Sequence, residues 1–184
     1  MLTAAAASAT ARPRENGLPP QCAGAFQRLK TLSDPDRKLV RLQPRQTTIE
    51  ALASAPAPNP VPTRRRTQFQ RQAWKVVAQI TQFRLLPDGS IELALYDHGA
   101  YMRAGIPSPK CLSSTSRARR ATLGVRARFT SKCGLAKQNW QDLGAVVYVT
   151  GVGFWSPDRP KQQAAPNGAE LQPVIGLSLI AGCR

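Results

Sequence analysis

The hydrophobic period changes twice along this chain, and these changes set the order of its secondary structure. Three segments alternate apolar with polar residues, which predicts β-strands at residues 74–85, 91–96 and 101–106. Residues 114–132 place apolar side chains at helical spacing, and residues 145–154 and 170–180 return to a strand pattern. The predicted order is strand, strand, strand, helix, strand, strand.

Five antiparallel strands with a helix between the third and the fourth form the OB-fold, a small barrel. The apolar residues of the first strand change parity near Thr81 and Gln82, which indicates a bulge. A bulge bends a long strand as barrel closure requires. An open α+β sheet of the same elements is the alternative. We predict a mainly β chain with one helix, folded as an OB-like small five-stranded barrel with an extended N-terminal arm.

Composition divides the chain into three parts. Residues 1–24 contain an Ala-rich run that reads as a disordered tail or the remnant of a signal peptide, because small residues stand at the spacing that signal peptidases cut. Residues 25–70 form the N-terminal arm, and residues 71–184 form the barrel domain. No run of about 18 apolar residues occurs, so we expect no transmembrane segment.

The N-terminal arm carries two short helix signals. Residues 25–32 predict one helix, and Thr47 or Thr48 is placed to cap another with Glu50 in its first turn. Prolines alternate over residues 55–63, which favours an extended, semi-rigid linker. The few apolar residues of the arm are expected to pack on a core made elsewhere.

The charge points to an anionic partner. Lys and Arg number 26 against 10 Asp and Glu, a formal net charge of +16. Such a surface attracts nucleic acid, anionic lipid headgroups or acidic proteins, although a solvated basic surface without a ligand is an equal alternative. The predicted polyanion contacts follow the linker and lie along the helix: Arg64, Arg65, Arg66, Arg117, Arg119, Arg120, Arg126 and Arg128. Bases or sugars would stack on Trp155, Tyr101 or Tyr148.

The sequence offers little to catalysis. It contains no Ser/His/Asp set, no phosphate-binding Gly-rich loop and no metal-ligand spacing, and its single histidine, His98, is expected in a surface turn. We therefore predict no catalytic residue, no metal and no cofactor. Gly124 is a weak point in the predicted helix, because glycine is about 1 kcal/mol less favourable than alanine there.

The four cysteines stand at positions 22, 111, 133 and 183, without CxxC spacing. They allow three pairings, and free buried thiols are the alternative. We favour a bridge between Cys111 and Cys133, which would leave Cys22 to pair with Cys183. The even number of cysteines, with the signal remnant, favours a secreted or periplasmic location over a cytoplasmic one.

Residues 151–174 read GVGFWSPDRPKQQAAPNGAELQPV, and LKTLSDPD, TTIEAL and IPSPKC stand upstream at residues 29–36, 47–52 and 106–111. From about Arg28 onward these pieces resemble, in order and spacing, an uncharacterised bacterial family with a GVGFFDxxHGQxGxAPNxIELHPV signature. The resemblance implies membership but supplies no activity.

The departures from that signature define a predicted site. Arg159 and Gln172 replace its two histidines, Lys161 replaces a glutamine and Ser156 an aspartate. Arginine donates only and is always protonated, so it cannot replace an imidazole as base or metal ligand. The resemblance thus implies an inherited hairpin with a new cationic rim. Its predicted ligand-binding residues are Arg159, Lys161, Asn167, Glu170 and Trp155.

Structural roles compete with these assignments. Asn167 with Gly168 is a turn signal, and Glu170 is expected more as a buttress than as a catalyst. Three functions remain: a non-catalytic module that binds nucleic acid or another polyanion, which we favour, a degenerate hydrolase or phosphodiesterase-like protein, and a secreted protein that interacts with the cell envelope.

Overall fold

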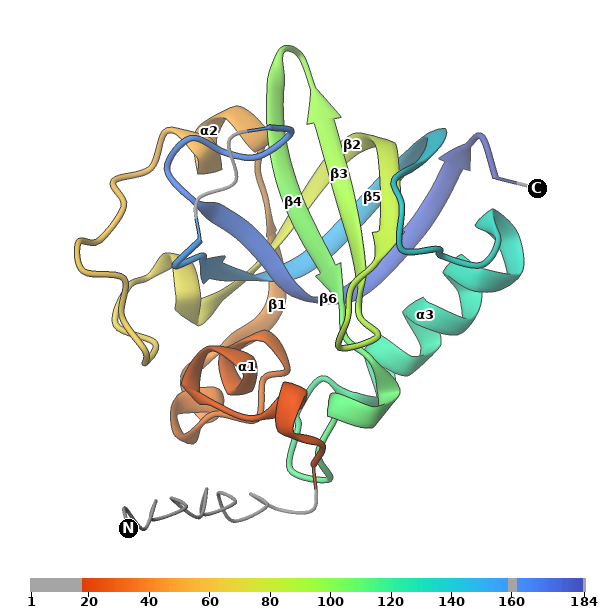
Figure 1. Cartoon of the computed structure of the whole chain (residues 1–184). Coiled ribbons are helices and arrows are strands. Elements are labelled where there is room, and N and C mark those ends of the chain that lie inside the picture. The colour runs from red at the N-terminus through yellow and green to blue at the C-terminus, as the bar shows by residue number, and fades with distance from the viewer. Residues whose placement is uncertain (1–17, 159–161, 184) are drawn as a thin grey trace, which may run out of the picture.

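The computed structural model describes residues 18–158 and 162–183 (Figure 1). The strands are β1 (Arg41–Gln46), β2 (Gln72–Leu85), β3 (Ile91–Asp97), β4 (Ala100–Ile106), β5 (Gln141–Trp155) and β6 (Ala169–Ala181). The α-helices are α1 (Ala25–Lys30), α2 (Ile49–Ala53) and α3 (Arg119–Cys133). Short 3-10 turns are η2 (Pro20–Cys22), η3 (Pro35–Leu39), η4 (Phe69–Arg71) and η5 (Pro109–Cys111).

The strands form one six-stranded mixed sheet in the order β1–β2–β3–β4–β6–β5, and β5 also pairs with β2. Strands β2 to β6 therefore close on one another in a ring, and β1 lies outside it along β2. In Figure 1, α1 and α3 lie near one end of the strands and α2 near the other. The prediction of a mainly β fold is confirmed.

The bulge predicted in the first strand of the ring is present. The pairing of β2 with both β3 and β5 shifts register between Ile80 and Gln82. Before the shift Val76 and Ile80 are buried, and after it Phe83 is buried on the opposite parity. A single long strand thereby supplies side chains to the core along its whole length.

The main core fills the ring and extends to α3. Leu93 and Met102 are fully buried inside the ring. Phe129 of α3 is also fully buried, and its ring meets that of Phe83 edge-on with centroids 5.2 Å apart. Helix α3 begins later than residue 114, and it ends at Gly134, which adopts a positive φ of 94°. The helix therefore closes one end of the core.

The sheet is not purely antiparallel. The pairing of β4 with β6 is parallel and spans Arg103 with Glu170 and Ala104 with Leu171. The pairing of β1 with β2 is parallel as well, and the apolar pattern did not predict β1. This strand contains Pro44 and is exposed at nearly every position, so it has no apolar face of its own. Its ladder with β2 holds it in place.

The N-terminal arm packs on the sheet. Thr48 caps α2 as predicted, because its hydroxyl accepts a bond from the Ala51 amide at 3.1 Å and Glu50 lies in the first turn. Ile49 and Leu52 of this helix are buried in the main core. Residues 55–63 form neither helix nor strand. Among the described residues, no helix is both long enough and apolar enough to cross a membrane.

The cysteines pair differently from the expected bridge. The disulfides join Cys22 to Cys111 and Cys133 to Cys183, with Cα–Cα distances of 5.0 and 4.9 Å. The predicted pairings of Cys111 with Cys133 and of Cys22 with Cys183 are therefore wrong. Cys111 precedes the 15-residue helix α3, and Cys133 is the last residue of that helix. That helix is about 22 Å long, whereas bridged Cα atoms lie within about 7 Å.

Candidate polyanion-binding groove

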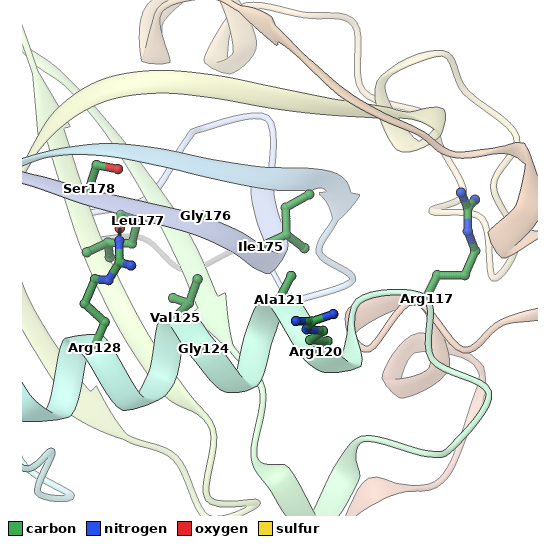
Figure 2. A pocket seen from close by; sticks show the side chains of 10 residues that line it. All are labelled: Arg117, Arg120, Ala121, Gly124, Val125, Arg128, Ile175, Gly176, Leu177 and Ser178. Atoms are coloured by element: carbon green, nitrogen blue, oxygen red, sulfur yellow. Dashed lines mark hydrogen bonds between the residues drawn. The ribbon is translucent and has the colours of Figure 1, made fainter.

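A groove of about 560 Å³ lies between α3 and β6 (Figure 2). Its helix side comes from Arg117, Arg120, Ala121, Gly124, Val125 and Arg128, and its strand side from Ile175, Gly176, Leu177 and Ser178. We call this feature the α3–β6 groove. None of its lining residues is acidic, so its charged side chains are all cationic.

Its three arginines are held differently. Arg117 donates to the carbonyls of Arg37 at 2.6 Å and Val40 at 3.0 Å, so much of its hydrogen-bonding capacity is used within the protein. Arg128 reaches from α3 toward Leu177 and donates to its carbonyl at 3.4 Å (Figure 2). Arg120 is exposed in the first helical turn. Arg120 and Arg128 therefore present the cationic side of the groove.

The start of α3 has an unusual charge distribution. Its first turn contains Arg119 and Arg120 and no acidic residue. A helix N-terminus carries partial positive charge, so acidic residues stabilise it and arginines do not. The helix dipole and the arginines therefore add to one positive field at this end of the groove.

Glycines keep the groove open. A Cβ atom at Gly124 would meet no heavy atom within 4 Å, so packing does not require a glycine there. At Gly176 a Cβ would come within 3.1 Å of the Thr150 Cβ, so a larger residue would push against β5. The groove therefore has no side chain at Gly124 on its helix side and none at Gly176 on its strand side.

Other polar side chains of α3 satisfy backbone carbonyls at strand edges. Thr122 is fully buried and donates to the Val174 carbonyl at 3.1 Å. Arg126 lies 3.5 Å from the carbonyl oxygens of Ile106 and Pro107, and burial lowers its pKa against the opposing charge of Asp88. Arg126 thus has a structural role beside the predicted binding role.

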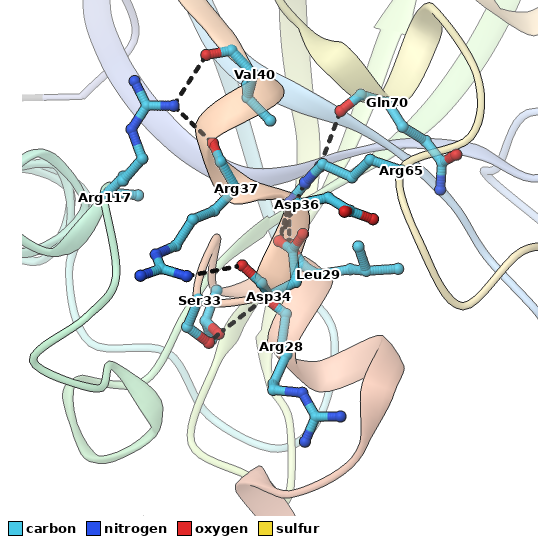
Figure 3. A network of polar contacts seen from close by, with 12 residues as sticks. Arg28, Leu29, Ser33, Asp34, Asp36, Arg37, Val40, Arg65, Gln70 and Arg117 are labelled. Atoms are coloured by element: carbon cyan, nitrogen blue, oxygen red, sulfur yellow. Dashed lines mark hydrogen bonds and ion pairs between the residues drawn. The ribbon is translucent and has the colours of Figure 1, made fainter.

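The arginine triplet is divided by its surroundings. Arg65 is 1% exposed and bonds Asp34 at 3.0 Å and the carbonyls of Gln70 and Leu29, each at 2.9 Å (Figure 3). Burial lowers its pKa, and the charge of Asp34 opposes that shift. The prediction that Arg65 contacts a polyanion is therefore wrong. Arg64 pairs at the surface with Asp36, and Arg66 is exposed.

The aromatic residue predicted at the hairpin is not available to a ligand. Trp155 is 2% exposed, its ring lies 4.6 Å from that of Phe69, and its indole N–H donates to the Thr67 hydroxyl at 3.0 Å. It is a core residue, and its assignment to ligand binding is wrong. Beside it, a Cβ at Gly153 would lie 2.1 Å from the Phe69 carbonyl oxygen, so only glycine permits this approach.

Asn167 connects the hairpin turn to the N-terminal arm. Its side-chain oxygen accepts from the Ala169 amide at 3.0 Å, and its amide group donates to the carbonyls of Leu52 and Ala55, each at 2.9 Å. These bonds use both polar atoms of the Asn167 side chain to hold the hairpin turn against the end of α2. Arg159 and Lys161, the predicted cationic rim, lie outside the described residues.

Glu170 is a buried carboxyl at the start of β6. It is 5% exposed, and burial raises its pKa while Lys30 and hydrogen bonds with Gln172 and Ser156 oppose the rise. The side chains that hydrogen-bond Glu170 are thus both neutral.

The described residues contain no candidate metal site, and the single histidine among them lies at the surface. No group of three or more His, Cys, Asp or Glu side chains among them could hold a metal ion. The His98 side chain is 92% exposed in the turn between β3 and β4, as expected, and contacts Asp97. The charged side chains that line the α3–β6 groove are all arginines.

The sequence indicated the arginines of the groove but not the β6 residues that face them. Residues 175–178 lie more than 40 positions from α3, and their pattern shows only a strand. One indication was present in the sequence. Gly176 and Ser178 stand on either side of the buried Leu177, so the outer face of β6 carries only small side chains at these two positions. Only the topology places that face beside α3.

No family model matches the chain, and no curated protein matches it. Among solved structures, one described as an aspartyl-tRNA synthetase from Leishmania major Friedlin resembles it with a TM-score of 0.45 and 10% sequence identity. The similarity covers 78% of this chain and 22% of that protein, so the chain spans about a fifth of its length. We base neither fold nor function on a likeness of this size.

Proposed function

We propose that this protein is a non-catalytic module that binds nucleic acid or a related polyanion through the α3–β6 groove. The observation that carries the proposal is a groove of about 560 Å³ lined by three arginines and no acidic residue. Phosphate contacts with Arg and Lys dominate the affinity of proteins for nucleic acid. Arginine also matches phosphate geometry through paired N–H donors.

The fold supports this assignment. The ring order β2–β3–β4–β6–β5, with α3 between β4 and β5 and β1 added outside the ring, supports an OB-like barrel. We propose that barrel as the scaffold, with residues 71–184 as the binding domain. Two disulfides join all four cysteines, which supports a protein of the oxidising periplasm or cell exterior.

The test replaces Arg120 by glutamate. Glutamate is favourable in the first turn of a helix, so Arg120→Glu is expected to fold normally. Lys137→Glu is the matched control, because it makes the same change of charge at an exposed position beyond the end of α3. Fluorescence anisotropy with a labelled oligonucleotide measures both at several salt concentrations.

We expect Arg120→Glu to lower the affinity at least tenfold and to reduce the slope of log K against log salt by about one, as for a lost phosphate contact. Lys137→Glu should change the affinity much less. Equal losses in the two variants would mean that only net charge matters. Wild-type affinity that stays flat between about 50 and 300 mM salt would contradict polyanion binding altogether.

A further inference from the structure

An exposed aromatic ring lies on the sheet next to the α3–β6 groove. Tyr148 of β5 is 37% exposed. Its Cα partner on β6 is Ser178, which lines the groove, and its partner on β2 is Val77, which is also 37% exposed. Directly opposed residues of neighbouring strands point to the same face, and adjacent strands lie about 4.8 Å apart. The ring is therefore one strand away from the groove.

The surface between the groove and the ring is low and polar. Gly176 and Ser178 supply it on β6, and Thr150 is the Cα partner of Gly176 on β5. Large side chains at these positions would separate the arginines from Tyr148, and none stands there. A ligand can thus lie across β6 in contact with both.

The far side of the ring is cationic too. Lys75 of β2 places its ammonium 4.3 Å from the Tyr148 ring centroid. None of the outward-facing residues of β2, β5 and β6 around Tyr148 is acidic: Lys75, Val77, Val146, Thr150, Gly176, Ser178 and Ile180. Positive charge therefore flanks the aromatic ring on both sides.

We propose that the α3–β6 groove and the Tyr148 face form one site for single-stranded nucleic acid; this inference rests on the proposed function. Proteins that bind single strands combine a cationic groove along the backbone with aromatic side chains on which bases stack. Arg120 and Arg128 contact phosphates, and an unpaired base stacks on Tyr148. Bases inside a duplex are stacked on their neighbours and cannot take this position without leaving the stack.

Lys75 covers the ring in the free protein. Its ammonium is a point charge on a flexible four-carbon stem, so an incoming base displaces it at low cost and the ammonium turns to a neighbouring phosphate. The same residue then serves as a cation–π partner without ligand and as a phosphate contact with ligand. Lys75 is thus part of the proposed site.

The experiment compares three ligands: a 20-nucleotide single strand of thymidines, a duplex that contains it, and inorganic polyphosphate, which has charge but no bases. Tyr148→Ala is the test variant and Tyr148→Phe the conservative one. Tyr96→Ala on β3 is the control, because its ring contacts that of Tyr101 on a different part of the sheet. Circular dichroism confirms that each variant is folded.

We expect the wild type to prefer the single strand to the duplex. Tyr148→Ala should weaken single-strand binding by roughly five- to a hundredfold, the loss of one stacked base, and leave polyphosphate binding unchanged. Tyr148→Phe should bind like the wild type. Unchanged single-strand binding by Tyr148→Ala, or an equal loss in Tyr96→Ala, would overturn this inference while polyphosphate binding upheld the proposed function. Failure to bind all three ligands would contradict both.

Discussion

The neighbouring side chains of Arg64 and Arg65 differ in their exposure to solvent. The Arg64 side chain is 55% exposed and pairs with Asp36, whereas the Arg65 side chain is 1% exposed and pairs with an equally hidden Asp34. One oxygen of Asp34 has no hydrogen-bond partner among the described residues, and the other accepts a hydrogen bond from Arg65. The net charge of the sequence therefore overstates the charge available to a ligand.

The first prediction concerns this pair. Arg65→Met should lower the free energy of unfolding by roughly 3–5 kcal/mol, because it leaves the buried Asp34 carboxylate without its counterion. Arg64→Met removes an exposed ion pair from the next position and should have a much smaller effect. Urea denaturation followed by circular dichroism measures both. Similar losses would contradict the contrast in burial that separates the two side chains.

Among the elements, β6 has the most varied surroundings. It begins beside β4 and β5, and beyond Leu171 its carbonyls at Val174 and Leu177 bond side chains of α3. The buried carboxyl of Glu170 stands at the parallel start of this strand. Because the pKa of this carboxyl is raised by burial, the stability of the folded protein depends on pH.

The second prediction gives the direction of that dependence. Burial raises the pKa of Glu170 above its ordinary 4.5, so the folded state keeps the proton to higher pH than the unfolded state. Stability from this group is complete below pH 4.5 and falls as the pH rises toward the raised pKa. Glu170→Gln does not titrate. Its stability relative to the wild type should therefore increase above pH 4.5 and then level off.

Urea unfolding at a series of pH values measures this difference. A Glu170→Gln variant that loses stability relative to the wild type as the pH rises would show that Lys30 and the hydrogen bonds outweigh burial.

In the molecule as a whole, the disulfides join the first described turn to η5 and the residues after β6 to the end of α3. Cys22 ties the first described turn to η5, and Cys183 ties the end of β6 to the last residue of α3. These bridges span 89 and 50 residues. They therefore restrict the unfolded chain over most of its length.

The third prediction follows from these spans. Replacing either pair by serine should lower the free energy of unfolding by roughly 2–5 kcal/mol. The longer bridge should contribute only about 0.5 kcal/mol more, because the entropy depends on the logarithm of loop length. Chemical denaturation tests the losses, and mass spectrometry of unreduced peptides tests the pairing. A peptide that links Cys111 to Cys133 would contradict the structure.

The ring strands and α3 were predictable because each has an apolar face. Even the bulge at Thr81 left a change of parity in the sequence. Strand β1 was not predictable, since its residues are polar or exposed and only β2 holds them. The burial of Arg65 depends on Asp34, 31 residues earlier, and no local pattern reports such a pairing. For the groove, the sequence indicated the arginines of the helix but not the strand that faces them.

The edge position of β1 also affects how copies of this protein meet. β1 pairs with β2 on one side, and within residues 18–158 and 162–183 no strand pairs with its other side, which forms a sheet edge. An open edge invites a strand from another copy, which is a common route to aggregation. Pro44 has no amide hydrogen to donate, and the exposed Arg41 and Arg45 repel a second copy of the same basic strand. The added strand thus ends the sheet in a form that discourages the growth of fibrils.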